Sequence, residues 1–391
     1  MSRNRKEILV ILFWLLVAAN VLWFGYRAIN RVINEEEMIE STSVTENIEI
    51  DEERLAFYYE QLPEEHKKAY ELLRDGLMER SSSIKIDGFD GDSIASIWRA
   101  VLLDNPEIFW TNEFRYSVTN GDTVVCDIIP NYCYTSEEIK VRQDKIQEFV
   151  TKFVSGVSKK ESDYNKILYT YETIINHTGY DLDALNNQHI DSVILGKSTV
   201  CGGYAKTTKF LLDYLGVECI YVLGDAENDE GVGLHAWNIV KCEDEYYFVD
   251  STWGDPVYLK DTEESRNEEI NYDYLCCNSE QLFVTHQLSE DYEYPLCTSL
   301  EWNYYVVNGR YFTEYNAAAI SELIKKDIEE GLKSSVFKFS DGSTYEEAKE
   351  YLLDVHVKEG KTLYDQMHGT ESTRYYYVDD SAQNKMILYW E

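Results

Sequence analysis

The feature that most constrains this chain is a cysteine followed at once by two glycines and then by a helical pattern. It occurs in the segment Val-Cys-Gly-Gly-Tyr-Ala, whose cysteine is Cys201. Residues 204–215 include apolar side chains at helical spacing, and Gly216 is a natural C-terminal stop. The pattern places Cys201 at or just before a helix N-terminus. There the helix dipole favours a thiolate, and backbone N–H groups can stabilise an oxyanion. An isolated Cys-Gly-Gly is more often a buried structural cysteine at a tight turn. A reactive Cys201 would also need a neighbouring base and a group that orients that base.

A hairpin pattern downstream supplies two such partners. Residues 234–242 alternate in polarity, with His235 near the start, and residues 245–250 are rich in Tyr, Phe and Val and end at Asp250. The polar turn between these segments predicts an antiparallel pair of strands. The plainer interpretation is that His235 only begins a strand and Asp250 only ends one.

The length of the hairpin loop decides whether the two side chains meet. A two-residue loop at residues 243–244 would place His235 opposite Thr252, one diagonal step from Asp250. A loop at residues 242–243 would place His235 directly opposite Asp250. Both registers put the two side chains on one face, whereas a loop of odd length would put them on opposite faces.

A thiol, an imidazole and a carboxylate in this chain order are the parts of a cysteine nucleophile system. In such a system Cys201 would be the nucleophile and His235 the base that takes the thiol proton. Asp250 would orient the imidazole and stabilise its protonated form.

The segment from about Tyr164 to Pro256 resembles the core of the transglutaminase-like superfamily, in particular its bacterial branch. The resemblance implies a papain-like α+β fold with Cys201, His235 and Asp250 as its catalytic triad. The flanking run from Asp104 to Trp110 also resembles bacterial members, less specifically. The matching pieces are Tyr180-Asp181, Gly196-Lys197, Val200 to Ala205, Gly216-Val217, His235 to Val240 and Val249 to Pro256.

Two departures from related patterns leave the second oxyanion donor unassigned. Papain-like proteases place a glutamine shortly before the nucleophile, and residues 196–200 contain no such amide. Animal transglutaminases use an upstream tryptophan, and residues 111–200 contain none. Tyr180 is a candidate substitute, although a plain structural role explains it equally well.

The N-terminus predicts a single-pass membrane anchor. Residues 8–26 are apolar apart from Asn20, and as a helix they would span roughly 30 Å, the thickness of a bilayer core. Arg3, Arg5 and Lys6 precede the segment, which favours a cytoplasmic N-terminus and an extracytoplasmic body. A cleaved signal peptide is the alternative, but no good small-residue cleavage site follows the apolar run.

Composition and pattern together predict an α+β protein with several regions. A papain-like, transglutaminase-like core would be flanked by small α+β modules and preceded by one transmembrane helix. The expected regions are a membrane anchor at 1–33, an acidic linker at 34–50, an α+β accessory domain at 51–160, the catalytic domain at 161–300 and a C-terminal α+β module at 301–391.

Net charge limits the binding partners of the chain, and the cysteine count limits its disulfide pairing. The chain has 72 acidic and 36 basic residues, a formal net charge of −36, which argues against nucleic-acid binding because a polyphosphate backbone would be repelled. Of eight cysteines, those other than a free Cys201 are odd in number and cannot all pair with one another. The proposed chemistry requires no metal and no organic cofactor.

These observations predict a cysteine-dependent enzyme at the cell envelope that acts on amide bonds through a thioester. The acyl group would pass to an amine, as in protein crosslinking, or to water, as in an amidase or peptidase. The expected partner is a protein or peptide-like acyl substrate, for which the cell wall is one source. The alternative from another class is a non-catalytic envelope module that keeps the fold.

Overall fold

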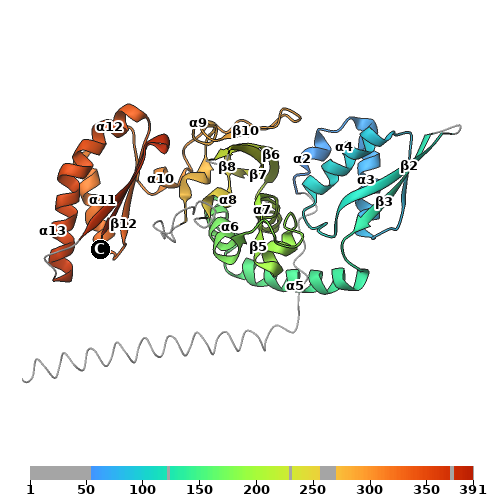
Figure 1. Cartoon of the computed structure of the whole chain (residues 1–391), viewed down its shortest axis with the longest axis horizontal. Helices are drawn as coiled ribbons and strands as arrows, with labels where there is room; N and C mark the ends of the chain where they lie inside the picture. Colours follow the sequence, from blue (N-terminus) through green and yellow to red (C-terminus); the bar gives the residue numbers. More distant parts are fainter. Residues whose placement is uncertain (1–53, 121–123, 229–230, 256–269, 370–373, 391) are drawn as a thin grey trace, which may run out of the picture. The chain divides into compact units, whose positions relative to one another are not determined.

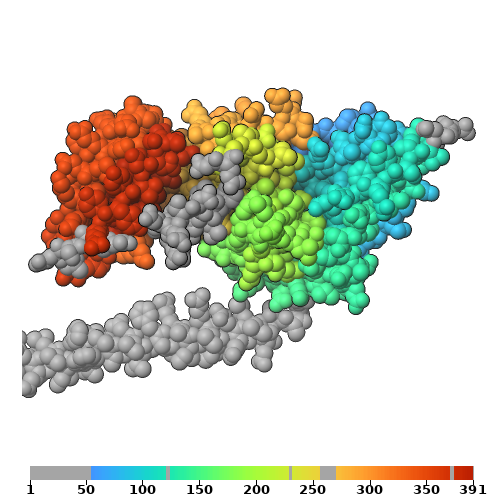
Figure 2. Space-filling view, viewed as in Figure 1, coloured from blue at the N-terminus to red at the C-terminus, as the bar shows by residue number. Residues whose placement is uncertain are grey.

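The computed structural model describes residues 54–120, 124–228, 231–255, 270–369 and 374–390 (Figure 1). The fold is α+β, as predicted, with helices and strands interspersed along the chain. Figure 2 shows the same residues in space-filling form with the same colours. The predicted anchor at 1–33 and linker at 34–50 lie outside the described residues. Within the described ranges, no helix is both long and apolar enough to cross a membrane.

The first region is a three-stranded antiparallel sheet of order β1-β3-β2 with helices packed against it. Its long final helix, α5, starts with a capping box in which Thr135 and Glu138 satisfy each other's backbone N–H groups. The elements are α2 (Phe57–Glu60), α3 (Glu64–Met78), β1 (Ile84–Asp87), α4 (Gly91–Asp104), β2 (Thr111–Asn120), β3 (Val124–Tyr132) and α5 (Ser136–Ser155).

The second region is a five-stranded antiparallel sheet of order β10-β6-β7-β8-β9, with helix α7 packed against β6 and β7. A short parallel pair, β4 and β5, precedes α7. The elements are α6 (Asp163–His177), β4 (Gly179–Tyr180), η1 (Ser192–Gly196), β5 (Ser198–Thr199), α7 (Cys201–Leu215), β6 (Cys219–Asn228), β7 (Gly231–Cys242), β8 (Glu245–Val249), α8 (Ser251–Gly254), η2 (Tyr272–Tyr274), β9 (Leu275–Cys277), α9 (Ser279–Leu282) and β10 (His286–Leu288).

The third region is a four-stranded sheet of order β11-β12-β14-β13, against which α11, α12 and α13 pack. Here β11 runs parallel to β12, and the other pairs are antiparallel. The elements are α10 (Tyr304–Val307), β11 (Tyr311–Phe312), α11 (Ala317–Glu329), β12 (Ser334–Phe339), α12 (Gly342–Tyr351), η3 (Leu352–His356), α13 (Val357–His368), β13 (Tyr375–Asp380), η4 (Ser381–Gln383) and β14 (Lys385–Trp390).

The buried apolar side chains form two clusters. One extends from Tyr58 to Cys297 and includes residues of both the first and the second region. The other lies in the third region and includes Phe337 and Trp390. The predicted boundary at residue 160 falls in the loop between α5 and α6, and the boundary at residue 300 falls before α10. The division into accessory, catalytic and C-terminal domains remains a prediction.

A buried charge cluster joins the first region to helix α7. Arg54 binds Glu107 and contacts Asp213, which lies near the end of α7. Asp213 also accepts two hydrogen bonds of 3.1 Å from Lys209. Asp104 accepts from the backbone N–H of Tyr58 and of the next residue. The run from Asp104 to Trp110 thus has a structural role at this junction.

A second buried charge cluster joins the third region to the five-stranded sheet. Asp273, in η2, accepts a hydrogen bond of 2.7 Å from Lys338 and another from Lys385. Its side chain is 2% exposed. Although burial raises the pKa of Asp273, the two ammonium groups outweigh it and hold that pKa at about 2. The carboxylate is therefore charged and fully paired at neutral pH.

We predict that Asp273→Asn strongly destabilises the protein, because it removes the counter-charge that two buried ammonium groups share and leaves Lys385 only Asp380, 3.6 Å away. Breaking a buried ion pair typically costs about 3–5 kcal/mol. The measurement is the free energy of unfolding in urea. Glu218→Gln is the control, because the Glu218–Lys241 pair is 40% and 35% exposed and should contribute less than about 1 kcal/mol. Equal, small losses in both variants would contradict the prediction.

Candidate active site

Cys201 is the first residue of helix α7, as the sequence pattern predicts. Val200 is its N-cap, with extended backbone, and the helix ends at Gly216, whose φ of 71° is left-handed. The cysteine is half-buried, whereas residues 202–205 behind it are buried. The thiol is therefore positioned at the positive end of the helix dipole and remains accessible.

The two glycines after Cys201 allow close packing on both sides of the first turn. A Cβ on Gly203 would lie 1.9 Å from Thr199 Oγ1 and 2.9 Å from the Asn187 carbonyl oxygen. A Cβ on Gly202 would lie 1.8 Å from Gln188 Oε1. The glycines thus let β5 and the preceding loop, with the Gln188 amide, approach the start of α7.

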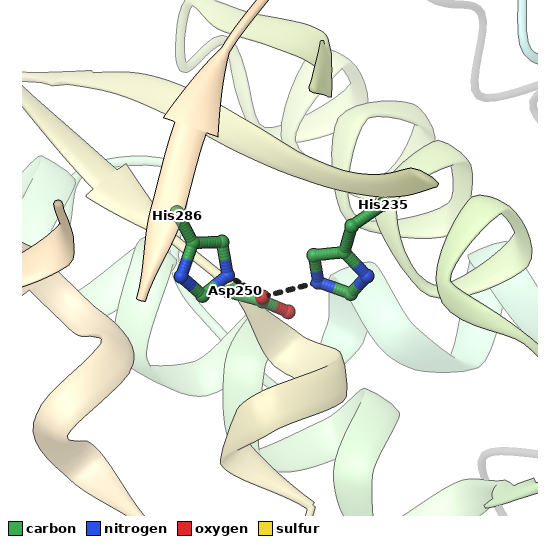
Figure 3. Close-up of side chains that lie close together, drawn as sticks. All are labelled: His235, Asp250 and His286. Atoms are coloured by element: carbon green, nitrogen blue, oxygen red, sulfur yellow. Dashed lines mark hydrogen bonds and ion pairs between the residues drawn. The ribbon is translucent and has the colours of Figure 1, made fainter. Parts of the chain in front are cut away.

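The hairpin adopts the first of the two predicted registers. Cys242 pairs with Glu245, so the loop is the two residues 243–244. Strand β8 ends at Val249, and the next residue, Asp250, caps helix α8. His235 Nε2 lies 2.7 Å from Asp250 Oδ2 (Figure 3). The two predicted partners therefore share one face of the hairpin and are hydrogen-bonded.

The thiol completes this arrangement. Cys201 lies close enough to His235 for the two side chains to interact, and this interaction contributes to the raised pKa of His235. Because Nε2 of His235 faces Asp250, Nδ1 is the ring nitrogen available to the thiol. The structure brings all three predicted residues together, and their catalytic roles remain a prediction.

The electrostatic environment favours a charged imidazole. Burial acts to lower the pKa of His235, but the Asp250 carboxylate and the hydrogen bonds to Asp250 and Cys201 outweigh it and raise that pKa to about 10. Burial acts to raise the pKa of Asp250, yet the charge and hydrogen bond of His235, together with those of His286, keep it well below its usual range. Asp250 is thus a carboxylate at neutral pH.

His286 is a fourth member of the site that sequence analysis did not find. Its Nε2 lies 3.1 Å from Asp250 Oδ2, the same oxygen that binds His235 (Figure 3). It comes from β10, beyond the segment from Tyr164 to Pro256 that carries the family resemblance. A single histidine in a three-residue strand has no local pattern that marks it, so no sequence signal was available.

Two tryptophans enclose the histidines. The rings of Trp237 and His235 are stacked with centroids 5.8 Å apart, and Trp253 contacts His235 at 6.2 Å and His286 at 4.8 Å. Both tryptophans are almost completely buried. Apolar walls of this kind exclude water and strengthen the ion pair between them.

Polar groups other than the predicted candidate also lie next to the first turn of α7. Tyr180, the sequence candidate for an oxyanion donor, pairs with Thr199 in the short β4–β5 sheet. The side chains against Gly202 are the Gln188 amide and the Tyr221 hydroxyl, the latter 3.4 Å from the position of a Cβ there. Gln188 lies upstream of residues 196–200, the positions shortly before the nucleophile where the papain-like pattern would place an amide, so the sequence pattern did not indicate it.

The two histidines and the carboxylate also have the spacing of a metal site. The ligand atoms of His235, Asp250 and His286 lie within 4.8 Å of one another. Here both imidazoles bind the carboxylate directly, at 2.7 and 3.1 Å. Because the three side chains satisfy one another, we interpret them as a hydrogen-bonded group and not as metal ligands.

Comparison with known proteins identifies the region that holds this site. Residues 127–262 match the family model of the transglutaminase-like domain. Kyphoscoliosis peptidases of Mus musculus and Homo sapiens are each 24% identical over 153 residues, which cover 36% of this chain and 23% of the relative. The chain thus spans about a quarter of the length of these curated relatives.

Solved structures give more distant similarities. A crystal structure of a TGase is 17% identical, with a TM-score of 0.26, and the match covers 47% of this chain and 53% of that one. A candidate cysteine protease from Cytophaga hutchinsonii is 16% identical, with a TM-score of 0.25 and coverages of 37% and 64%.

Proposed function

We propose that this chain, which carries a transglutaminase-like domain, is a cysteine-dependent enzyme that cleaves an amide bond through a thioester on Cys201. The observation that supports this function most is the connected set of contacts at the start of α7. Cys201 interacts with His235, and His235 lies 2.7 Å from the buried carboxylate of Asp250. A nucleophilic thiol needs a base beside it, and the base needs an acceptor that orients it; His235 and Asp250 lie in these positions.

In the first half-reaction, His235 takes the thiol proton at Nδ1 and the Cys201 thiolate attacks the carbonyl carbon of the amide. The carbonyl π electrons move to oxygen and form a tetrahedral oxyanion. When the oxyanion collapses, the C–N bond breaks and His235 gives its proton to the departing amine. The acyl group remains on Cys201 as a thioester.

In the second half-reaction, water or an amine attacks the thioester carbonyl and gives a proton to His235. The C–S bond breaks, and the proton returns to the Cys201 sulfur. Asp250 accepts the Nε2–H of His235 throughout, so it fixes the tautomer and stabilises the imidazolium. Hydrolysis is the outcome that we would assay first, because the curated relatives are named peptidases.

The oxyanion needs donors close to Cys201. The N–H groups of Gly203 and Tyr204 already bind the Val200 carbonyl, so we assign one donor to the backbone N–H of Cys201. We assign the second to Gln188, whose side-chain amide lies against Gly202. The two ends of an amide are assigned from their partners, so either can face the substrate.

We predict that Cys201→Ala lowers amide turnover by about 10³-fold or more, as for other triad nucleophiles. His235→Ala should be nearly as damaging, and Asp250→Asn less so, because Asp250 acts through His235. Turnover of a labelled casein, scored for cleavage and for incorporation of a fluorescent amine, measures both outcomes. Full turnover in Cys201→Ala would exclude the mechanism.

Thiol alkylation provides a substrate-free form of the same test. Iodoacetamide should label Cys201 first at neutral pH, because His235 accepts its proton, and labelling should slow in His235→Ala. Cys133 is the matched control: it is more exposed than Cys201, but burial of its sulfur raises its pKa to about 11. If Cys133 reacts as fast as Cys201, the domain is better explained as a non-catalytic binding module.

A second prediction concerns the oxyanion donor. Gln188→Ala should reduce turnover by about 100-fold, the usual effect of removing such a donor, with unchanged thermal stability. Gly202→Ala should have a similar effect, because the new Cβ would displace the flexible Gln188 side chain. Gln366→Ala, at an exposed amide on α13, is the control. If Tyr221→Phe abolished turnover and Gln188→Ala did not, the assignment would be wrong.

We further propose that the domain is extracytoplasmic and acts on a protein or peptide-like substrate of the cell envelope. The support is the basic cluster of Arg3, Arg5 and Lys6 before the apolar residues 8–26. Reporter domains fused after residue 50 should be active only on the extracytoplasmic side. A cytoplasmic signal would contradict both the orientation and the envelope substrate.

A further inference from the structure

We infer that His286 is a positioning residue of the catalytic group: by sharing Asp250 Oδ2 with His235, it limits how tightly the carboxylate holds the proton of His235. This role presupposes that Cys201, His235 and Asp250 act as proposed above. His286 would touch neither the substrate nor the reacting atoms, and would act through Asp250.

The Asp250 carboxylate accepts four hydrogen bonds, two on each oxygen. Oδ1 binds the backbone N–H groups of Thr252 at 2.8 Å and Trp253 at 3.1 Å. Oδ2 binds Nε2 of His235 at 2.7 Å and Nε2 of His286 at 3.1 Å. Figure 3 shows the two imidazoles approaching the carboxylate from opposite sides. Only Oδ2 is shared between two side chains that can carry a proton.

His286 itself is fixed in place. Its second ring nitrogen, Nδ1, lies 2.8 Å from Thr285 Oγ1, so rotation of the ring would break one hydrogen bond or the other. Trp237 and Trp253 contact its ring, with centroids 5.1 and 4.8 Å away, and the side chain is completely buried. A buried imidazole held at both nitrogens gives Asp250 a donor of constant geometry.

The fold brings His286 to Asp250 from the far edge of the sheet. In the strand order β10-β6-β7-β8, three spacings separate β10 from β8, or about 14 Å in a flat sheet. Asp250 lies beyond the end of β8, as the N-cap of α8, and from there its side chain reaches His286. Gly224 of β6 permits the close approach of β10, since a Cβ there would lie 2.1 Å from the Gln287 carbonyl oxygen.

The second donor changes the chemistry of the first. A carboxylate oxygen that already accepts a hydrogen bond is less basic, so it holds a neighbouring imidazolium less tightly. His235 must release its proton to the departing amine in the proposed mechanism, and a general acid that is too weak does so slowly. His286 would thus make His235 a better acid while the Asp250–His235 contact is kept.

Few other groups around the site can change charge in the working pH range. Burial raises the pKa of each neutral acid that faces Asp250, so these stay protonated. They are Tyr171 from α6, Tyr204 from α7, Tyr274 from η2 and Cys277 from β9. Cys201 from α7 faces His235, His286 from β10 faces Asp250, and Tyr221 from β6 faces Cys201 with its pKa raised by burial. A change in the pH profile after mutation of His286 can therefore be attributed to the Cys201–His235 pair.

The test uses the full-length protein and compares His286→Leu, which removes the donor, with His286→Gln, which keeps an N–H near the position of Nε2. In His286→Leu, casein turnover should fall by about 10- to 100-fold, the equivalent of one hydrogen bond to a charged group. The alkaline inflection of Cys201 alkylation by iodoacetamide should move to higher pH, because Asp250 then holds the His235 proton more tightly. His286→Gln should restore most of the turnover and the original inflection.

Thr285→Val provides a variant that leaves the imidazole in place. Loss of the Thr285 contact frees the ring, so the inflection should move in the same direction by a smaller amount, which decides the question if His286→Leu does not fold. An unchanged inflection in every folded variant, or equal losses in His286→Gln and His286→Leu, would overturn the inference. These outcomes differ from failure of the proposed function, in which the wild-type Cys201 itself would show no preferential alkylation and no turnover.

Discussion

The buried carboxylate of Asp250 is the charge on which the rest of the site depends. An uncompensated carboxylate in this interior would be strongly destabilising, and each of its four hydrogen bonds comes from a different residue. Those donors belong to helix α8, strand β7 and strand β10, while the Asp250 N–H binds the Tyr274 carbonyl. Satisfying one side chain therefore fixes the end of β8, the start of α8 and the position of β10.

Helix α7 links this site to the rest of the chain. Its first residue is Cys201, and near its last turn Asp213 joins the buried cluster of Lys209 and Arg54. Further along the chain, Asp273 binds two lysines of the third region and directly precedes Tyr274, whose carbonyl accepts the Asp250 N–H. The flanking regions are thus attached through α7 and through the residue before Tyr274, two elements that also contact the candidate site.

The same geometry explains why the sequence motif alone does not define the candidate site. The match to the transglutaminase-like domain covers residues 127–262, which include Cys201, His235, Asp250 and Gln188 but not His286. A thiol and an imidazole suffice to form a thioester, whereas the fate of the acyl group depends on which nucleophile can reach it. The donors to Asp250 lie partly outside the matched segment, because His286 follows residue 262.

The sequence by itself determined the local features. Glycine spacing and the apolar pattern predicted the start of α7 at Cys201, and the two-residue turn at 243–244 was one of two registers that brought His235 and Asp250 to the same face. Short-range geometry fixes such features, because helix starts and hairpin registers depend on neighbouring residues. Tertiary structure decided the contacts of His286 and Gln188. Neither lies in a periodic pattern, and each reaches the site only because strand pairing or a loop packed on glycines brings distant segments together.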